Sequence, residues 1–285
     1  MVVQSATKSE AEAWRARIEA HNEQTVRTRG DLVYEDMWST LAQRFKDDPR
    51  RTDDPVVNLL ADWLTPESTV LDVGGGAGRY ALPLALRAKQ VTVVDPSPSM
   101  LEALRESAAD AGIENVSGLQ ASWEDADVEL HDVVLCANVV YGVAEIGGFV
   151  RKLEAAARDR VAIVVYMDAP LSRMSPIWTD VHGEKRIEMP GLPELLPVLW
   201  EMGIYPDVAM LPPAAGTRTL PNLETAIAMA RHFLYIEAGS EKEKRLREIA
   251  PRYVVETPEG VTMRGASERP QGVVWWRAGD RQTSG

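Results

Sequence analysis

The sequence predicts an α/β fold built on a doubly wound, mostly parallel sheet. From Thr65 onward, short β-branched runs alternate with helical segments. Most of these runs are apolar on both faces, as strands buried between two helical layers are. A glycine-rich turn directly follows the first run, at residues 74–78. Strand–helix alternation of this kind is joined by right-handed crossovers, so helices should cover both faces of the sheet.

Helices should precede the sheet, and residues 1–64 are expected to form an N-terminal helical cover. Ser9 and Glu12 have capping-box spacing, and Asp54 with Pro55 is typical of a helix start, here of a short helix to residue 64. A further helix is expected from Asp31, because five apolar side chains then share one helical stripe: Tyr34, Met37, Trp38, Leu41 and Phe45. Residues 47–54 are predicted to be a charged loop.

The α/β core is expected at residues 65–212. Its first five strands are predicted at residues 69–73, 91–95, 116–120, 132–137 and 161–167, and its helices at 78–87, 98–111, 146–158 and 192–202. Ser97, Pro98 and Gly112 supply start and stop signals for the second helix. Pro83 lies inside the first, which predicts a bend or a later start. A sixth strand is expected at 205–211.

In the last third of the chain, strand and helix signals alternate less regularly. A helical patch at 177–186 and helices at 223–238 and 240–250 are expected, followed by a hairpin around residues 257–260 and a last strand at 273–277. We therefore assign residues 213–268 to a helical and hairpin insert before the last strand. Residues 269–285 would hold that strand and a tail.

Composition narrows the classes of partner. The 285 residues are 45% hydrophobic and 26% charged, and the net charge is −12 without a basic stripe, which disfavours a nucleic-acid partner. One cysteine, Cys136, and four scattered histidines provide no spacing for a metal site. Neither a secretory signal nor an apolar span is found, so a cytoplasmic protein without a membrane partner is expected.

The segment VLDVGGGAGRY carries the clearest chemical signal. It contains the pattern D-x-G-x-G-x-G at Asp72, Gly74, Gly76 and Gly78, where a strand ends and a helix begins. Such a turn lets the backbone approach a ligand closely. The dinucleotide fingerprint G-x-G-x-x-G fails, because its third glycine falls on Arg79.

In these residues the chain resembles the class I S-adenosylmethionine-dependent methyltransferases. The resemblance continues in Asp95, which ends the second strand and is followed by Met100-Leu101, and in the segment ASWED at 121–125. The strand from Asp132 and the lead-in residues Trp38, Ala42 and Phe45 also match. The resemblance implies a Rossmann-like methyltransferase fold with a seven-stranded sheet, and S-adenosyl-L-methionine as cofactor.

The resemblance also assigns cofactor contacts. Asp72 would serve the ammonium of the cofactor and Asp95 the two ribose hydroxyls, which a carboxylate accepts bidentately. The Gly74, Gly76 and Gly78 turn and Asn138 would lie beside its methionine part. Ser122 and Trp123 would contact the adenine, and packing is an equal alternative for Trp123. Many family members carry an acid near position 122, and Glu124 or Asp125 would substitute for it here.

The acceptor side is expected at the ends of the fourth and fifth strands. Tyr141, Tyr166 and Asp168 are the candidates for catalysis, with Glu145 and His182 as further possible bases. We expect a small, partly apolar acceptor, in a pocket lined by Met167, Met174, Ile177, Trp178 and Met189.

Other functions stay open on the sequence. The segment NVVY at 138–141 stands where amino-methyltransferases of nucleic acids carry a related motif, but without its two prolines. An NAD(P)-linked oxidoreductase and a non-catalytic cofactor-binding module are the alternatives. The sequence leaves open the methylated atom and the oligomeric state.

Overall fold

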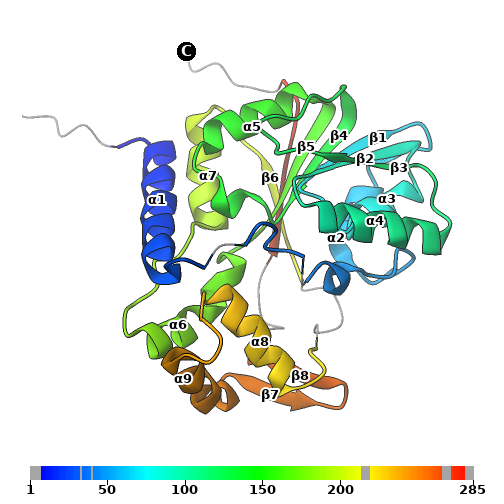
Figure 1. Cartoon of the computed structure of the whole chain (residues 1–285). Helices are drawn as coiled ribbons and strands as arrows, with labels where there is room; N and C mark the ends of the chain where they lie inside the picture. Colours follow the sequence, from blue (N-terminus) through cyan, green and yellow to red (C-terminus); the bar gives the residue numbers. More distant parts are fainter. Residues whose placement is uncertain (1–7, 33, 40, 213–218, 265–270, 280–285) are drawn as a thin grey trace, which may run out of the picture.

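The computed structural model describes residues 8–32, 34–39, 41–212, 219–264 and 271–279. Within these residues a seven-stranded sheet has the order β3-β2-β1-β4-β5-β9-β6 (Figure 1). The strands are β1 (Thr69–Val73), β2 (Gln90–Asp95), β3 (Val116–Gln120), β4 (His131–Ala137), β5 (Ala157–Tyr166), β6 (Asp207–Leu211) and β9 (Gln271–Arg277). β1 to β5 pair in parallel, whereas β9 runs antiparallel to β5 and β6. The predicted doubly wound, mostly parallel sheet is confirmed.

The strand order reverses between β1 and β4. The chain builds β1, β2 and β3 outward in one direction and then returns to place β4 on the other side of β1. At such a switch point the crossovers leave in opposite directions, so a crevice opens at the carboxyl ends of the two strands. The glycine-rich turn after β1 and the residues after β4 meet at this edge.

Helices cover both faces of the sheet, as predicted. On one face lie α2 (Pro55–Ala61), α3 (Ala81–Ala85) and α4 (Pro98–Ala111), and on the other α1 (Glu10–Arg29), α5 (Ile146–Ala155) and α7 (Leu192–Glu201). Within β1, Val70 packs in the hydrophobic cluster on the face of α2, α3 and α4, and Leu71 packs in the cluster on the face of α1, α5 and α7, because successive side chains of a strand point to opposite faces. In the described part of the chain, no helix is long and apolar enough to cross a membrane.

Helix ends follow local chemistry. The capping box of Ser9 and Glu12 is present, and Ser97 caps α4, which ends at Gly112 in the left-handed conformation. α3 begins at Ala81 rather than at residue 78, because the turn glycines adopt positive φ that a helix does not allow. The later start places Pro83 in the first turn, where a missing N–H costs little. α5 ends at Ala155, three residues before the predicted boundary, because β5 begins at Ala157.

The predicted helix from Asp31 is wrong. Of the described residues in 31–45, only Ala42–Phe45 are helical, as a short 3-10 turn. The Asp36 side chain accepts hydrogen bonds from the backbone of Trp38 and from the hydroxyls of Ser97 and Ser99. These bonds compete with helical ones. The apolar side chains therefore pack against neighbouring elements without forming a helical stripe.

The remaining elements form a small lobe beyond the end of β5 (Figure 1). It contains α6 (Ser175–His182), α8 (Leu223–Phe233), α9 (Glu241–Ile249) and the hairpin β7 (Val254–Thr257) and β8 (Gly260–Met263). One hydrophobic cluster joins Trp178, Phe233 and Leu246 from its three helices with Leu41 from the N-terminal segment. α6 thus packs with the elements of the predicted insert, although its residues lie within the range predicted for the α/β core, 65–212. The division at 64, 212 and 268 stays a prediction, and residues 213–218, 265–270 and 280–285 lie outside the described residues.

Candidate active site at the carboxyl edge of the sheet

The glycine-rich turn lies tightly against its neighbours. Gly74, Gly76 and Gly78 all have positive φ, between 55° and 82°. A Cβ atom on Gly74 would come 2.3 Å from the Val139 side chain, and one on Gly78 2.4 Å from the Leu104 side chain. Both positions therefore demand glycine for space as well as for conformation.

Asp72 lies beneath this turn. Its side chain is fully buried, and neither carboxylate oxygen has a hydrogen-bond partner in the structure as described. Burial raises the pKa of Asp72 to about 7, and the nearby Asp95 carboxylate adds to the rise. The backbone N–H of Ala81 opposes the rise, although it lies outside good hydrogen-bond geometry. A buried carboxylate without a partner fits a cationic ligand group, such as the ammonium of S-adenosylmethionine.

Asp95 ends β2 and is held from two sides. Its Oδ2 accepts from the Gly76 N–H and its Oδ1 from the Ser97 N–H, each at 2.9 Å. Burial nevertheless raises the pKa of Asp95 above its usual value. A Cβ on Gly76 would lie 3.9 Å from Oδ2, so the glycine leaves room beside the carboxylate. Each oxygen keeps a lone pair, which fits the ribose diol of the same cofactor.

Part of the N-terminal segment reaches this edge. Ala42 clusters with Ala77 of the turn and with Met100 of α4, and Phe45 packs against them. Trp38 contacts Phe45 in an edge-on arrangement, with 5.5 Å between ring centroids. The lead-in residues named by the resemblance thus lie next to the turn. Asp36, which bonds Ser97 and Ser99 at the start of α4, carried no sequence signal beyond being polar within an apolar stripe.

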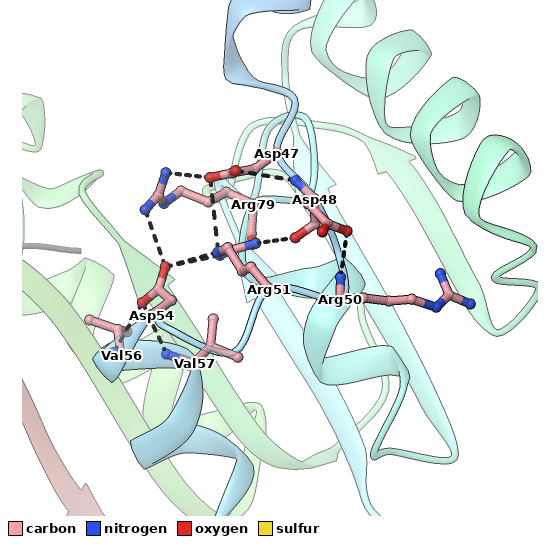
Figure 2. Close-up of polar contacts among 8 residues, drawn as sticks. All are labelled: Asp47, Asp48, Arg50, Arg51, Asp54, Val56, Val57 and Arg79. Atoms are coloured by element: carbon pink, nitrogen blue, oxygen red, sulfur yellow. Dashed lines mark hydrogen bonds and ion pairs between the residues drawn. The ribbon is translucent and has the colours of Figure 1, made fainter. Parts of the chain in front are cut away.

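An ion-pair network anchors the end of the turn (Figure 2). The guanidinium of Arg79 contacts Asp47 at 2.8 Å and Asp54 at 3.1 Å. Arg51 also pairs with Asp54 at 3.0 Å, and the other oxygen of Asp54 caps α2 through Val56. The predicted charged loop is therefore partly buried structure, because the side chain of Asp54 is only 1% exposed. In the sequence, Arg79 stands out only because it occupies the place of the third glycine of the dinucleotide fingerprint.

A polar cluster joins the ends of β4, β5 and β9. Asn138 has φ +62°, and its Oδ1 accepts from the Tyr141 hydroxyl at 3.2 Å and from Gln271 Nε2 at 3.3 Å. The Tyr141 oxygen in turn accepts from the Tyr166 N–H at 2.7 Å. Positive φ at a residue other than glycine is a strained conformation that surrounding contacts must maintain. The cluster therefore fixes the chain where it leaves β4, and Gln271 in it was not predicted.

The other candidates for catalysis differ in exposure. Tyr166 is half-buried at the end of β5, and Asp168 is exposed two residues later. Glu145 is paired with Arg15 of α1, whereas His182 lies in the small lobe, where it contacts the Leu234 carbonyl. Among the described residues, no group of three or more His, Cys, Asp or Glu side chains could hold a metal ion.

Comparison with known proteins agrees with this geometry. Residues 70–159 match the family model described as a methyltransferase domain. This stretch is a methyltransferase domain. A methyltransferase from Thiobacillus denitrificans, solved with S-adenosyl-L-homocysteine, superposes with a TM-score of 0.52 over 85% of this chain and 98% of that one. At 16% identity, that likeness shows the fold.

The curated relatives match over part of their length. An uncharacterised protein of Haemophilus influenzae is 28% identical over 63% of this chain and 66% of its own. A 23S rRNA (uracil-C5)-methyltransferase of Shewanella sediminis is 42% identical, and a ubiquinone biosynthesis O-methyltransferase of Rickettsia prowazekii 39%. These two matches cover 22% and 30% of this chain, and 14% and 33% of the relatives. The chain therefore spans less than two thirds of the length of each.

The expected adenine contacts of the methyltransferase domain have other partners in this structure. Trp123 is 5% exposed, donates to the Phe149 carbonyl and lies beneath the Lys152 ammonium, 4.8 Å from the ring centroid. Ser122 exchanges hydrogen bonds with Asp125. Packing is the contact observed for Trp123, and its role toward adenine stays a prediction. Glu124 and Asp125 are exposed.

The expected acceptor lining is divided between two places. Met174, Ile177 and Trp178 are buried in the core of the small lobe. Met167 and Met189 are half-buried and pack against the core of the sheet. The first three are thus primarily packing residues, because α6 turns its apolar face toward α8 and α9.

Proposed function

We propose that this chain binds S-adenosylmethionine across the glycine-rich turn and methylates a small, at least partly apolar molecule. The observation that carries the proposal is the fully buried, unpartnered carboxylate of Asp72 beneath a turn whose other neighbour is Asp95. The bound cofactor supplies a methyl group on a positive sulfur, whose leaving group is a neutral thioether. The enzyme then has to bind the cofactor and the acceptor, orient them relative to each other and exclude water.

Each cofactor-binding residue has one task in the proposal. Asp72 neutralises the ammonium group, and Asp95 accepts from two ribose hydroxyls. Asn138 and the glycine turn lie along the methionine part. Ser122 and Trp123, with their exposed neighbours at 124 and 125, border the adenine.

The acceptor side is built by the chain leaving β4 and β5. Tyr141 acts as a positioning residue, because its hydroxyl bonds both Asn138 and the Tyr166 backbone. Tyr166 and Asp168 orient the acceptor at the end of β5. Holding the nucleophile in line with the methyl group and the sulfur lowers the activation free energy by roughly 7–11 kcal/mol. A general base is required only where the nucleophile carries a proton of high pKa, and Asp168 is the proposed group for that case.

Two features favour a small acceptor over a nucleic acid. The net charge of −12 repels a phosphate backbone. The ring of Tyr141 is 4% exposed and belongs to the sheet core, so in this arrangement it offers no face for stacking on a base. The rRNA methyltransferase among the relatives makes nucleic acid the necessary competitor in any assay.

Titration calorimetry tests the cofactor. S-adenosylmethionine and S-adenosylhomocysteine should bind, and Asp95→Asn should weaken both by about 1–3 kcal/mol, the range of a charge-assisted hydrogen bond. Asp127→Asn, at an exposed acid, is the matched control. Unchanged affinity in Asp95→Asn would remove Asp95 from the site. Tight NAD binding without binding of S-adenosylhomocysteine would favour the oxidoreductase alternative.

A transfer screen tests the acceptor. Labelled methyl groups from S-adenosylmethionine should reach a phenol, amine or carboxylic acid of the panel and leave RNA, DNA and peptides unlabelled. Robust labelling of RNA or DNA that disappears in Tyr141→Ala would revive the NVVY interpretation. Cofactor binding without transfer to any member of a broad panel would support a non-catalytic module.

A further inference from the structure

A buried arginine lies beside the small lobe, outside the proposed cofactor contacts. Arg186, four residues after the end of α6, is 3% exposed. Its Nη1 donates to the Leu171 carbonyl at 3.4 Å, whereas its Nη2 is buried without a partner. No carboxylate of the described residues lies within ion-pair distance of the guanidinium. Burial lowers the pKa of Arg186, and the charges of Tyr235 and Glu188 oppose this.

Helix α1 fixes the backbone on which Arg186 stands. Gln24 donates to the Lys185 carbonyl at 2.9 Å and accepts from the Ile187 N–H at 2.7 Å, and His21 bonds the Ile187 carbonyl. Lys185 and Ile187 are exposed, while Arg186 between them is buried. Polar side chains of α1 therefore hold the segment with the guanidinium turned inward, which explains why Gln24 and His21 are buried on a mostly polar helix.

The neighbours of the guanidinium also carry unpartnered polar atoms. Arg186 stacks 4.8 Å from the centroid of Trp178, whose ring lies 4.3 Å from that of His182. Trp178 Nε1 and His182 Nδ1 are buried without partners. Burial lowers the pKa of His182 to about 4, and its Nε2 contacts the Leu234 carbonyl, so Nδ1 is a hydrogen-bond acceptor at neutral pH. Adjacent side chains thus present two donors and one acceptor.

A ligand group can complete this set. A buried cation without a counter-charge is costly, and buried polar atoms are almost always paired. The planar guanidinium matches a carboxylate, and one buried cation balances one negative charge rather than two. The acceptor nitrogen of His182 would pair with a hydroxyl or amine hydrogen on the same molecule.

The position of the segment relates it to the acceptor side. A Cβ on Gly191 would come 2.1 Å from the Met167 carbonyl oxygen, so the chain that follows Arg186 crosses the end of β5. We propose that Arg186 binds a carboxylate of the methyl acceptor, assisted by Trp178 and His182. This inference rests on the proposed function. Because Nη2 is shielded from solvent in this structure, binding of the anion requires the side chains around the guanidinium to move apart.

Binding of matched acids and amides tests the assignment. The probes are benzoate and 4-hydroxybenzoate, each beside its amide, and inorganic phosphate, titrated with S-adenosylhomocysteine at saturation. Wild type should bind a carboxylate at least about tenfold more tightly than the amide. Arg186→Met should weaken that binding roughly tenfold to a hundredfold, and Arg186→Lys less, because lysine keeps the charge and loses the fork. Arg27→Met, which removes the exposed pair with Glu184 on the same segment, is the control.

The readouts separate this proposal from the proposed function. S-adenosylhomocysteine affinity should stay within about twofold in every variant, and the unliganded Arg186→Met protein should unfold at or above the wild-type midpoint. The proposal is overturned if neither carboxylate binds wild type while S-adenosylhomocysteine does, if only phosphate binds, or if Arg186→Met keeps carboxylate affinity. A lower unfolding midpoint with unchanged carboxylate binding would show a purely structural arginine. Failure of wild type to bind S-adenosylhomocysteine would count against the proposed function instead.

Discussion

Asp72→Asn should make the unliganded protein more stable at neutral and alkaline pH while weakening cofactor binding. The carboxylate of Asp72 is fully buried, and neither oxygen has a partner in the structure as described. Replacing it with an amide of nearly the same shape removes a charge that the folded state solvates poorly. The same replacement removes the group that we propose as the counter-charge for the ammonium of S-adenosylmethionine.

The size of the effect follows from the pKa of Asp72, about 7 in the folded protein against an ordinary value of 3.8. The folded state therefore holds its proton more tightly than the unfolded state does. Stability is full below about pH 4 and is lost as the pH rises to about 7. The full loss is roughly 4 kcal/mol at about 1.4 kcal/mol per tenfold change in proton affinity. About 2–3 kcal/mol of it develops between roughly pH 5 and pH 8.

Urea unfolding across this pH range is the assay, followed by the fluorescence of the eight tryptophans. The difference in free energy of unfolding between Asp72→Asn and wild type isolates Asp72, since other titrating groups are common to both. That difference should grow by about 2–3 kcal/mol from pH 5 to pH 8 in favour of the variant. Parallel stability curves would refute the raised pKa. Unchanged S-adenosylhomocysteine affinity in the variant would separate Asp72 from the cofactor.

Two further variants test the contacts that support the site. Arg79→Met should lower the free energy of unfolding by about 1–3 kcal/mol in urea titrations, because Asp54 loses one of its two cationic partners, and it should weaken S-adenosylhomocysteine binding; a loss no larger than that of Arg50→Met, at an exposed arginine, would contradict this. Tyr141→Phe should lower the free energy of unfolding by about 1–3 kcal/mol, because the Tyr166 N–H loses its acceptor. Methyl transfer should fall in this variant with little change in S-adenosylhomocysteine affinity, and an equal fall in both would argue against a positioning role.

Local patterns were sufficient to predict the sheet and to locate the turn that we propose as the cofactor site. The runs that became β1, β2, β4 and β5 are mostly apolar because both faces of the sheet are covered there, and this requirement is visible in each of these runs separately. The edge strand β3 is mostly exposed and was recognised from its place in the strand–helix alternation. Asp72 and the turn glycines could be found in the same way, since strand end, glycine spacing and helix start are adjacent in the chain. Asp95 could also be located from local signals, because a capped helix start follows it directly.

What the tertiary structure decided depends on residues far apart in the chain. The segment after Asp31 has helical spacing, yet Asp36 bonds serines more than sixty residues away. Asp54 and Arg79 are ordinary charged residues until folding buries them together. Likewise, the residues next to Arg186 in the sequence do not indicate that contacts with α1 turn the Arg186 side chain inward. Nor do they indicate that no carboxylate of the described residues lies within ion-pair distance of it. Burial and pairing of charge are properties of the folded surroundings, whereas periodicity and caps are properties of neighbouring residues.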